Sequence, residues 1–427
     1  MNSRDPRSTT AINNLPNEVL LRIISETIAY ALEPHEWLPC TPHHYQTRAV
    51  IKGVCRKWHH LMDSSPELWT SFTIGDPWGD QTKANIIMPS RGLLEIWQAR
   101  SRDWPINIHL YSGPFAVQPD DSILMMTTLL PSTHRWSRLD LAFDERTAEA
   151  FLDLDHLGFG LKDIRASSFC CAKMNDQLLR AFGQCPNLER LVWIFAVGLP
   201  MTDQPTFHNA LHLFPWERLC HISLEVSWTS TEFCSFFRSS TSAQSIQLNM
   251  QQHPADSSGI DLHPIITLPK LRYLGIESAS SIYYYVGCLN LPGIQYLAII
   301  PKMAPLQDSS GWGAPPAAVA NPLFQDFLER TMPSAQAMII HGYPFSNLNA
   351  IRLFSNECLL RIPVLEIEVG ESTAVAVIEY FELSGLLTGH HIEHQGPFMG
   401  WCYDSLRCCA VRDIFSSFYF NYHVWIH

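Results

Sequence analysis

A six-residue apolar template recurs nine times along the chain and restricts its fold more than any other feature. The template is L-x-x-L-x-L with apolar substitutes, and its copies cover residues 136–141, 161–166, 188–193, 219–224, 243–248, 271–276, 294–299, 335–340 and 362–367. Successive fourth positions lie 23 to 41 residues apart, with a mean of about 28. Apolar residues two apart occupy one face of a strand, so each copy predicts a short, half-buried strand.

Helical patterns fill the intervals between these strands. They cover residues 147–154, 175–185, 230–239, 322–331 and 373–383, and a further helix followed by a strand is expected over 93–112. Strand, turn and helix at this period resemble the leucine-rich-repeat family. The resemblance implies an α+β or α/β solenoid in which each unit buries its apolar face on its neighbours. An ordinary α/β or β-rich domain with chance spacing is the alternative.

The array departs from that family after each strand, where the consensus Asn or Cys is missing. The comparable positions hold Asp144, Phe169, Ala196, Ser227, Gln251, Ala279 and Lys302. Because the consensus side chain satisfies backbone groups at the turn, its loss predicts an irregular array. Residues 303–322 are rich in Pro, Gly, Ser and Ala and predict a loop. We expect the array to span 75–383 and to be followed by an irregular tail at 384–427.

Residues 12–74 carry a helical pattern instead, and the preceding residues 1–11 are expected to be disordered. Pro16 suits a first helical turn, and apolar residues then recur at helical spacing: Val19, Leu20, Ile23, Ile24 and Ile28. A second helix is expected over Tyr45–Asp63 with the apolar stripe Ile51, Val54, Cys55, Trp58, Leu61 and Met62. Basic residues at i, i+4 steps predict its solvent-facing side: Arg48, Lys52 and Arg56. Helices this short either cap the following domain or complete their core with a partner.

The segments LPNEVLLRII, VCRKWHHL and SSPELW, in this order, resemble the F-box of fungal F-box proteins. The resemblance implies that these helices bind a Skp-type adaptor, and through it a cullin–RING ubiquitin ligase. The implied adaptor-binding residues are Leu15, Pro16, Val19, Leu20, Ile23, Trp58, Leu61, Pro66, Leu68 and Trp69. Residues 33–47 lengthen the link between the two helices by roughly ten residues over a compact F-box, which loops tolerate at little cost.

A small F-box joined to a repeat array is typical of a substrate-recognition subunit, which is not itself an enzyme and needs no cofactor. The alternative is a structural interaction protein whose F-box-like helices only cap the array. A client would contact the strand face and the turns after each strand. The candidate client-binding residues are Asp140, Asp144, Trp193, Phe195, Glu225, Trp228, Glu277, Glu366 and Glu368. Their acidic character favours a client surface with basic and apolar residues.

Charge and composition exclude several other classes of function. The formal net charge of −12 argues against nucleic acid as a partner, because phosphate neutralisation needs a surplus of Lys and Arg. No apolar run approaches the ~18 residues of a membrane helix, so no membrane contact is expected. The twelve cysteines form no C-x-x-C pair, and the chain has no secretory signal pattern. We therefore expect a reducing compartment, the cytoplasm or the nucleus.

Two short motifs leave an enzymatic alternative open. LGFGLKD (157–163) contains an isolated G-x-G, which is better interpreted as a turn than as a phosphate loop. GHHIEH places His390, His391 and His394 beside Glu393, and two of these histidines would share a face only if the segment were helical. A surface histidine cluster is the simpler interpretation, and a hydrolase or metal enzyme built on the tail is the alternative. No metal is predicted.

Overall fold

The computed structural model describes residues 15–32, 44–74, 89–112, 119–153, 160–195, 214–226, 228–250, 264–278, 286–301, 322–340, 362, 364–368, 391–395 and 398–402. Their contacts separate two compact units. The described parts of 15–170, with 184–187, form the first unit, and those of 171–183 and 188–402 form the second.

The first unit begins with helices α1 (Asn17–Leu32), α2 (His44–Val54) and α3 (Arg56–Ser64), then the 3₁₀ turn η3 (Pro66–Trp69). The prediction of a single helix over Tyr45–Asp63 is wrong, because the helix is interrupted at Cys55, whose backbone is extended (φ −163°, ψ 171°). Gly53 and the β-branched Val54 precede the break, and both weaken a helix. Cys55 then caps α3, and its carbonyl accepts from the His59 N–H at 2.9 Å.

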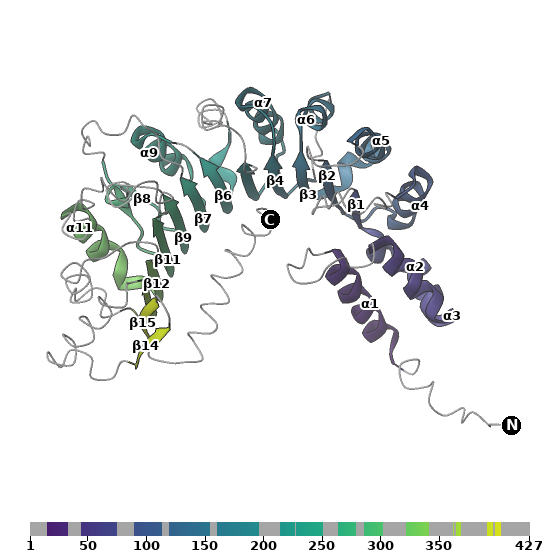
Figure 1. The fold of residues 1–427 in the computed structure, drawn as a ribbon, viewed down its shortest axis with the longest axis horizontal. Helices are drawn as coiled ribbons and strands as arrows, with labels where there is room; N and C mark the ends of the chain where they lie inside the picture. Colours follow the sequence, from purple (N-terminus) through teal and green to yellow (C-terminus); the bar gives the residue numbers. More distant parts are fainter. Residues whose placement is uncertain are drawn as a thin grey trace, which may run out of the picture. The chain divides into compact units, whose positions relative to one another are not determined.

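Four parallel strands follow in the first unit, in the order β1 (Ser71–Ile74), β2 (Ile106–Ser112), β3 (Trp136–Phe143) and β4 (Asp163–Ser168). Helices α4 (Arg91–Ser101), α5 (Pro119–Leu129) and α6 (Glu145–Leu152) cover one face of this sheet (Figure 1), and the 3₁₀ turn η4 (Leu130–Arg135) precedes β3. The helix and strand expected over 93–112 are confirmed as α4 and β2.

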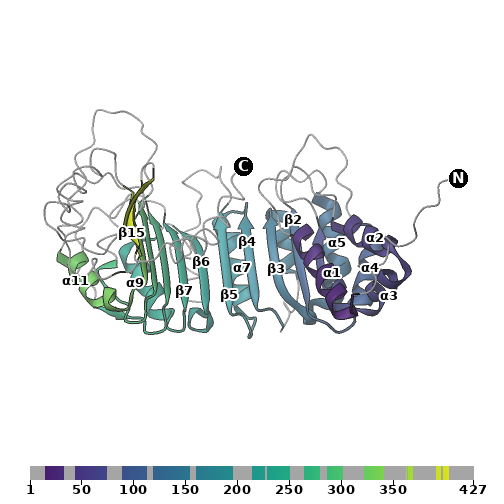
Figure 2. The same cartoon turned by 90° about the horizontal axis from the view of Figure 1, so that it is seen from below.

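The second unit contains a larger sheet. Its parallel strands are β5 (Arg190–Phe195), β6 (His221–Val226), β7 (Ser245–Met250), β9 (Tyr273–Ser278), β11 (Tyr296–Pro301), β12 (Ala337–Ile340) and β13 (Val364–Glu368). An antiparallel hairpin of β14 (His391–Gln395) and β15 (Phe398–Cys402) continues from β13. Helices α7 (Ala172–Gly183), α9 (Ser230–Ser239) and α11 (Pro322–Thr331) lie on one face of it (Figure 2). The short strands β8 (Ile266–Thr267) and β10 (Leu289–Asn290) form a separate pair, and η6 (Trp216–Arg218) and η8 (Met332–Ser334) are 3₁₀ turns.

The strand register matches the sequence template position by position. All nine template copies end in a strand of the parallel sheets. In the first unit, the fourth positions Leu139 and Ile164 are partners. In the second unit the fourth positions pair from strand to strand in the series Leu191, Ile222, Ile246, Leu274, Leu297, Met338 and Leu365. Those whose side chains are described are at most 2% exposed, so the template marks the core-facing side of each strand.

The helices between the strands largely follow the sequence prediction. Those expected over 230–239 and 322–331 have the predicted bounds, and those expected over 147–154 and 175–185 begin and end two or three residues earlier. The predicted helix over 373–383 and nearly all of the predicted loop over 303–322 lie outside the described residues. The hairpin β14–β15 was not predicted, because the tail lacks the template.

Candidate adaptor-docking site

Helix α1 carries two apolar stripes, one buried and one exposed. Leu20, Ile24 and Ile28, at i, i+4 spacing, are buried in the first unit. Val19 and Ile23 directly precede Leu20 and Ile24, so they lie on the adjacent flank of the helix, and 42% and 37% of their surfaces are exposed. Pro16, one turn before, is also exposed. An apolar stripe left in water beside a complete core is typical of a surface that a partner covers.

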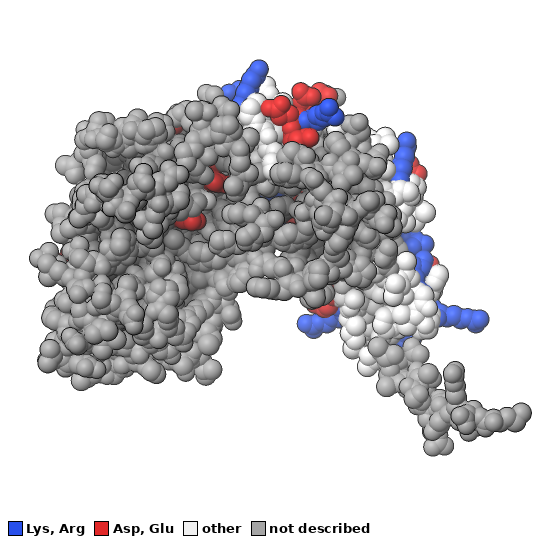
Figure 3. Space-filling model, in the orientation of Figure 1, with Lys and Arg blue, Asp and Glu red and all other residues white. Residues whose placement is uncertain are grey.

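Helix α2 adds a second exposed apolar pair. Val50 and Val54 are 68% and 53% exposed and lie one turn apart. The apolar spacing had placed Val54 in the buried stripe, and this prediction is wrong, because the break at Cys55 changes the helical phase between α2 and α3. Around these helices the molecular surface carries individual Lys and Arg side chains that project outward (Figure 3).

The start of α1 is held in place from α3. The Lys57 ammonium donates to the Leu15 carbonyl at 2.8 Å, so the Leu15–Pro16 dipeptide is fixed to the helix that follows it by 42 residues. Leu15 is half-buried and Pro16 exposed. This contact presents the beginning of the exposed stripe in a defined position.

The other predicted adaptor-binding residues support this surface from inside. Leu20, Trp58, Leu61, Leu68 and Trp69 are at most 8% exposed, and Pro66 is half-buried. Their apolar surface is already used within the chain. Of the ten, the exposed residues are Pro16, Val19 and Ile23, next to the half-buried Leu15, and the binding of an adaptor by the ten stays a prediction.

Arg48 lies in the interior, although its spacing with Lys52 and Arg56 predicted the solvent-facing side. It is 2% exposed, and its guanidinium donates to the carbonyl oxygens of Leu68 (3.0 Å) and Ser71 (2.9 Å). The same group lies over the indole rings of Trp97 and Trp69, 4.8 and 5.8 Å from their centroids. Burial lowers the pKa of Arg48 to about 10. The two carbonyls and two aromatic faces offset the desolvation of its charge.

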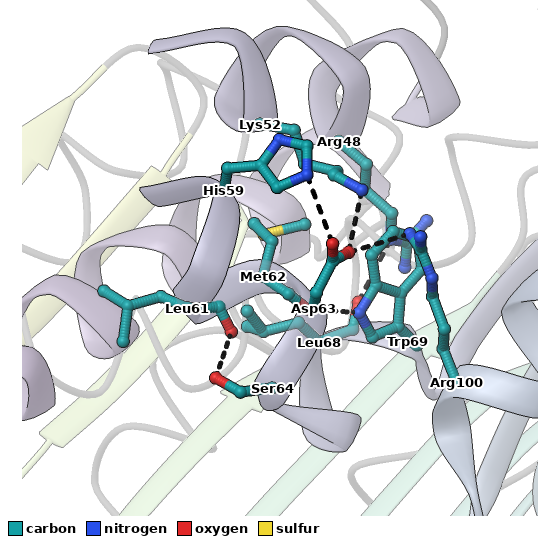
Figure 4. Close-up of polar contacts among 10 residues, drawn as sticks. All are labelled: Arg48, Lys52, His59, Leu61, Met62, Asp63, Ser64, Leu68, Trp69 and Arg100. Carbon is teal, nitrogen blue, oxygen red and sulfur yellow. Dashed lines mark hydrogen bonds and ion pairs between the residues drawn. The ribbon is translucent and has the colours of Figure 1, made fainter. Parts of the chain in front are cut away.

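Asp63 contacts Lys52, Arg100 and His59 at the edge of this cluster (Figure 4). Its carboxylate accepts from Lys52 at 2.7 Å and pairs with Arg100 and His59, each at 3.2 Å. Partial burial opposes ionisation, but Lys52 and Arg100 hold the pKa of Asp63 below its usual value. The indole N–H of Trp69 donates to the Met62 carbonyl at 2.6 Å.

Helix α4 closes the cluster from the α/β part of the first unit. Trp97 is 2% exposed and lies 6.4 Å from Trp69 and 6.2 Å from Phe72, measured between ring centroids. Arg100 stacks over Trp69 at 4.5 Å while its guanidinium reaches Asp63. The N-terminal helices are thus packed onto the segment that follows them, with an exposed apolar stripe left on α1.

Residues 12–75 match the F-box-like family. The match covers α1, α2, α3, η3 and β1 and supports an F-box protein. An F-box-like domain suggests an adaptor role in ubiquitin ligation in general, and domains of this kind generally bind Skp-type adaptors. Such proteins are typically non-catalytic subunits. No curated protein matches the chain.

The predicted client-binding residues of the first unit make internal contacts. Asp140 on β3 is 9% exposed, and its carboxylate receives a bidentate pair of hydrogen bonds from Arg138 at 2.8 and 3.0 Å. His109 Nδ1 on β2 lies 2.8 Å from the same carboxylate. Asp144 caps α6 by accepting from the Thr147 N–H at 3.0 Å. Both carboxylates are therefore engaged within the fold.

Two predicted client-binding tryptophans belong to the core of the second unit, and their assignment to a surface is wrong. Trp193 is fully buried, and its indole N–H donates to the Asn175 side chain at 3.2 Å. It occupies the sixth template position and so shares a face with Leu191. Trp228 is 1% exposed and packs on Phe236, with ring centroids 4.8 Å apart.

The remaining candidates lie toward the carboxyl ends of strands in the second unit. Glu225 on β6, Asn249 on β7 and Glu277 on β9 are partners in one row across three neighbouring strands. Both glutamates are half-buried. Phe195, Glu366 and Glu368 lie in β5 and β13, and their side chains are outside the described part of the structure.

The tail motif GHHIEH is not helical where it is described. Residues 391–395 form strand β14, so the i, i+4 face that a helical metal site would need does not exist there. Within the described ranges, no group of three or more His, Cys, Asp or Glu side chains is arranged to hold a metal ion. No helix in the same ranges is long and apolar enough to cross a membrane.

Proposed function

We propose that the chain is the substrate-recognition subunit of a Skp–cullin–F-box ubiquitin ligase. The observation that carries this proposal is the exposed stripe of Pro16, Val19 and Ile23 on an F-box-like helix whose adjacent apolar stripe is already packed. A fully buried Val or Ile side chain contributes about 1.5–3 kcal/mol, so covering this stripe supplies useful binding energy. In the proposal the adaptor covers it and links the chain to a cullin–RING ligase.

The α/β part would then serve as an irregular leucine-rich-repeat solenoid that holds the client. The in-register fourth positions and the helices between strands support this proposal. The proposed organisation is an F-box over 12–74, an array over 75–383 and a tail over 384–427. We propose a non-catalytic protein of the cytoplasm or nucleus with a protein client, and without a nucleic-acid, membrane or cofactor partner.

One observation favours the alternative of a structural interaction protein. The cluster of Arg48, Trp69, Trp97 and Asp63 packs the F-box-like helices onto α4, as a simple cap would require. A cap, however, has no need for exposed Val19 and Ile23. Binding to a Skp-type adaptor distinguishes the two functions.

The Val19→Asp/Ile23→Asp variant is expected to lose adaptor binding at least tenfold. Both changes introduce a charge into a surface that the adaptor would desolvate. The full chain is co-expressed with a Skp-type adaptor, and the dissociation constant is measured by calorimetry. Because both side chains are exposed, the melting temperature should stay within about 2 °C of that of the unmodified chain.

The matched control is Ile96→Asp/Leu124→Asp, which changes two exposed apolar side chains outside the F-box-like region. Each is 49% exposed, so the burial and chemistry resemble those of the test pair. This control should retain adaptor binding. An unmodified chain that binds no adaptor, or a test variant that binds as well as the control, would favour the structural alternative.

Client capture is expected to depend on the row of Glu225 and Glu277. Alanine at both positions removes two carboxylates from neighbouring parts of the strand face. With the proteasome inhibited, we expect the yield of ubiquitinated client to fall several-fold while adaptor binding is unchanged. Glu217→Ala/Glu329→Ala removes the same charge from exposed positions and should capture clients normally. If both variants capture the client equally well, client recognition does not depend on Glu225 and Glu277.

A further inference from the structure

Two cysteine thiols meet inside the second unit. The Sγ atoms of Cys234 and Cys288 lie 3.6 Å apart, although the residues are 54 positions apart in sequence. Cys234 lies in α9 and is 1% exposed, whereas Cys288 directly precedes β10 and is half-buried. From the sequence, the cysteines are interpreted as small buried apolar residues, because no C-x-x-C motif brings two of them together.

The backbone around Cys288 is fixed by hydrogen bonds from two sides. Its carbonyl accepts from the Ile266 N–H at 2.8 Å, within the β8–β10 pair. Arg330 on α11 donates to the carbonyls of Gly287 and Leu289, at 2.8 and 3.2 Å, on either side of Cys288. Cys234 is held by its helix. The two sulfur atoms are therefore brought together by secondary structure and not by a flexible loop.

The electrostatics of the two thiols differ. The hydrogen bond with Cys288 lowers the pKa of the Cys234 thiol, and Arg238, one helical turn away, acts in the same direction against burial. The pKa of Cys288 is raised by the hydrogen bond with Cys234 and by partial burial. Of the two, Cys234 is thus the sulfur that more readily becomes a thiolate, the nucleophilic form.

We propose that Cys234 and Cys288 form a redox-sensitive thiol pair that hydrogen peroxide converts to an intramolecular disulfide. The proposal is independent of the ubiquitin-ligase function. Burial of Cys234 favours a small oxidant, and a sulfur partner at 3.6 Å needs only a modest shift to reach the S–S bond length of about 2.05 Å. The bond would join α9 to the segment before β10. It would close a covalent loop that contains β7 and β9.

The reaction balances with one peroxide molecule. The Cys234 thiolate attacks one peroxide oxygen, the O–O bond breaks, and the products are a sulfenic acid and hydroxide. The hydroxide takes up the proton that Cys234 released and becomes water. The Cys288 sulfur then attacks the sulfenic sulfur, the S–O bond breaks, and the second water leaves with the proton of Cys288. Two thiols lose two electrons, and one peroxide is reduced to two waters.

The test treats the purified full chain with hydrogen peroxide, blocks remaining thiols with an alkylating agent and maps disulfides by mass spectrometry without reduction. We expect a peptide joining Cys234 to Cys288, lost on dithiothreitol treatment and at least tenfold more abundant than any other cysteine pair. The oxidised chain should melt on the order of 5 °C higher, because a loop of this length is closed.

Two variants and one control separate the proposal from general oxidation. Cys288→Ser and Cys234→Ser should both abolish the cross-linked peptide and the shift in melting temperature. Cys220→Ser removes another half-buried thiol of the second unit and should change neither. The cross-link itself is measured on the unmodified chain, so the test does not depend on how well a variant folds. Peroxide that yields sulfinic acid at these positions, or no linked peptide, would overturn the proposal.

Discussion

The Trp97→Ala variant is expected to lose about 3–5 kcal/mol in the free energy of unfolding of the first unit. The indole is almost completely buried, and its removal leaves a cavity between Trp69 and Phe72. The Arg48 guanidinium would lose the aromatic face 4.8 Å away, and its buried charge would then be poorly compensated. Urea denaturation of the full chain, with hydrogen exchange on peptides from α2 to α4, measures the change.

Trp104→Ala is the matched control. Trp104 lies in the turn after α4, in the same unit, but 49% of its surface is exposed. Its replacement should change the free energy of unfolding by no more than about 0.5 kcal/mol. If the two variants are equally stable, the cluster of Arg48, Trp69 and Trp97 does not hold the F-box-like helices in place.

The repeat template predicted the strands because the alternation of apolar residues depends only on neighbouring positions in the sequence. Leu139, Ile222 and Leu297 are fourth positions on different strands, and each is buried next to its equivalent on the neighbouring strand. An apolar residue every second position is enough to place such a strand. Strand β1, with the sequence SFTI, was missed because it lies inside the range 12–74 that was interpreted as helical.

The docking surface could be predicted only in part. Spacing alone could not decide whether Val19 or Leu20 faces the core, since both fit one helical stripe. Arg48 was assigned to solvent because it follows the spacing of Lys52 and Arg56, whereas its partners, Trp97 and the carbonyl of Ser71, come from distant segments. Contacts of this kind have no local signal in the sequence.

A second large effect on the free energy of unfolding is expected from a buried ionic network on the sheet of the first unit. The Asp140 carboxylate is paired with Arg138 at 2.8 Å and with His109 at 2.8 Å, and Arg165 lies 3.9 Å away. In the strand register, His109, Asp140 and Arg165 are partners on three neighbouring strands. Burial opposes ionisation of Asp140, but His109 and Arg138 hold its pKa well below the usual range.

Asp140→Ala should therefore cost about 3 kcal/mol in the free energy of unfolding, because it leaves two guanidinium groups and an imidazole without their central anion. Asp163→Ala is the matched control on the same face. Its carboxylate lies 3.6 and 4.0 Å from Arg165 and Arg138, and these longer contacts predict a loss of no more than about 1 kcal/mol. Chemical denaturation of the full chain, followed by fluorescence, compares the two variants.

The stabilisation by Asp140 should also depend on pH in a defined direction. A carboxyl whose folded pKa is lowered contributes fully above its unfolded pKa, about 3.9, and loses that contribution as the pH falls toward the folded value. The unmodified chain should therefore keep its advantage over Asp140→Asn at pH 6–8 and begin to lose it progressively as the pH falls below about 4. A difference in unfolding free energy that stays constant from pH 7 down to pH 3 would show that Asp140 is held by packing and not by its charge.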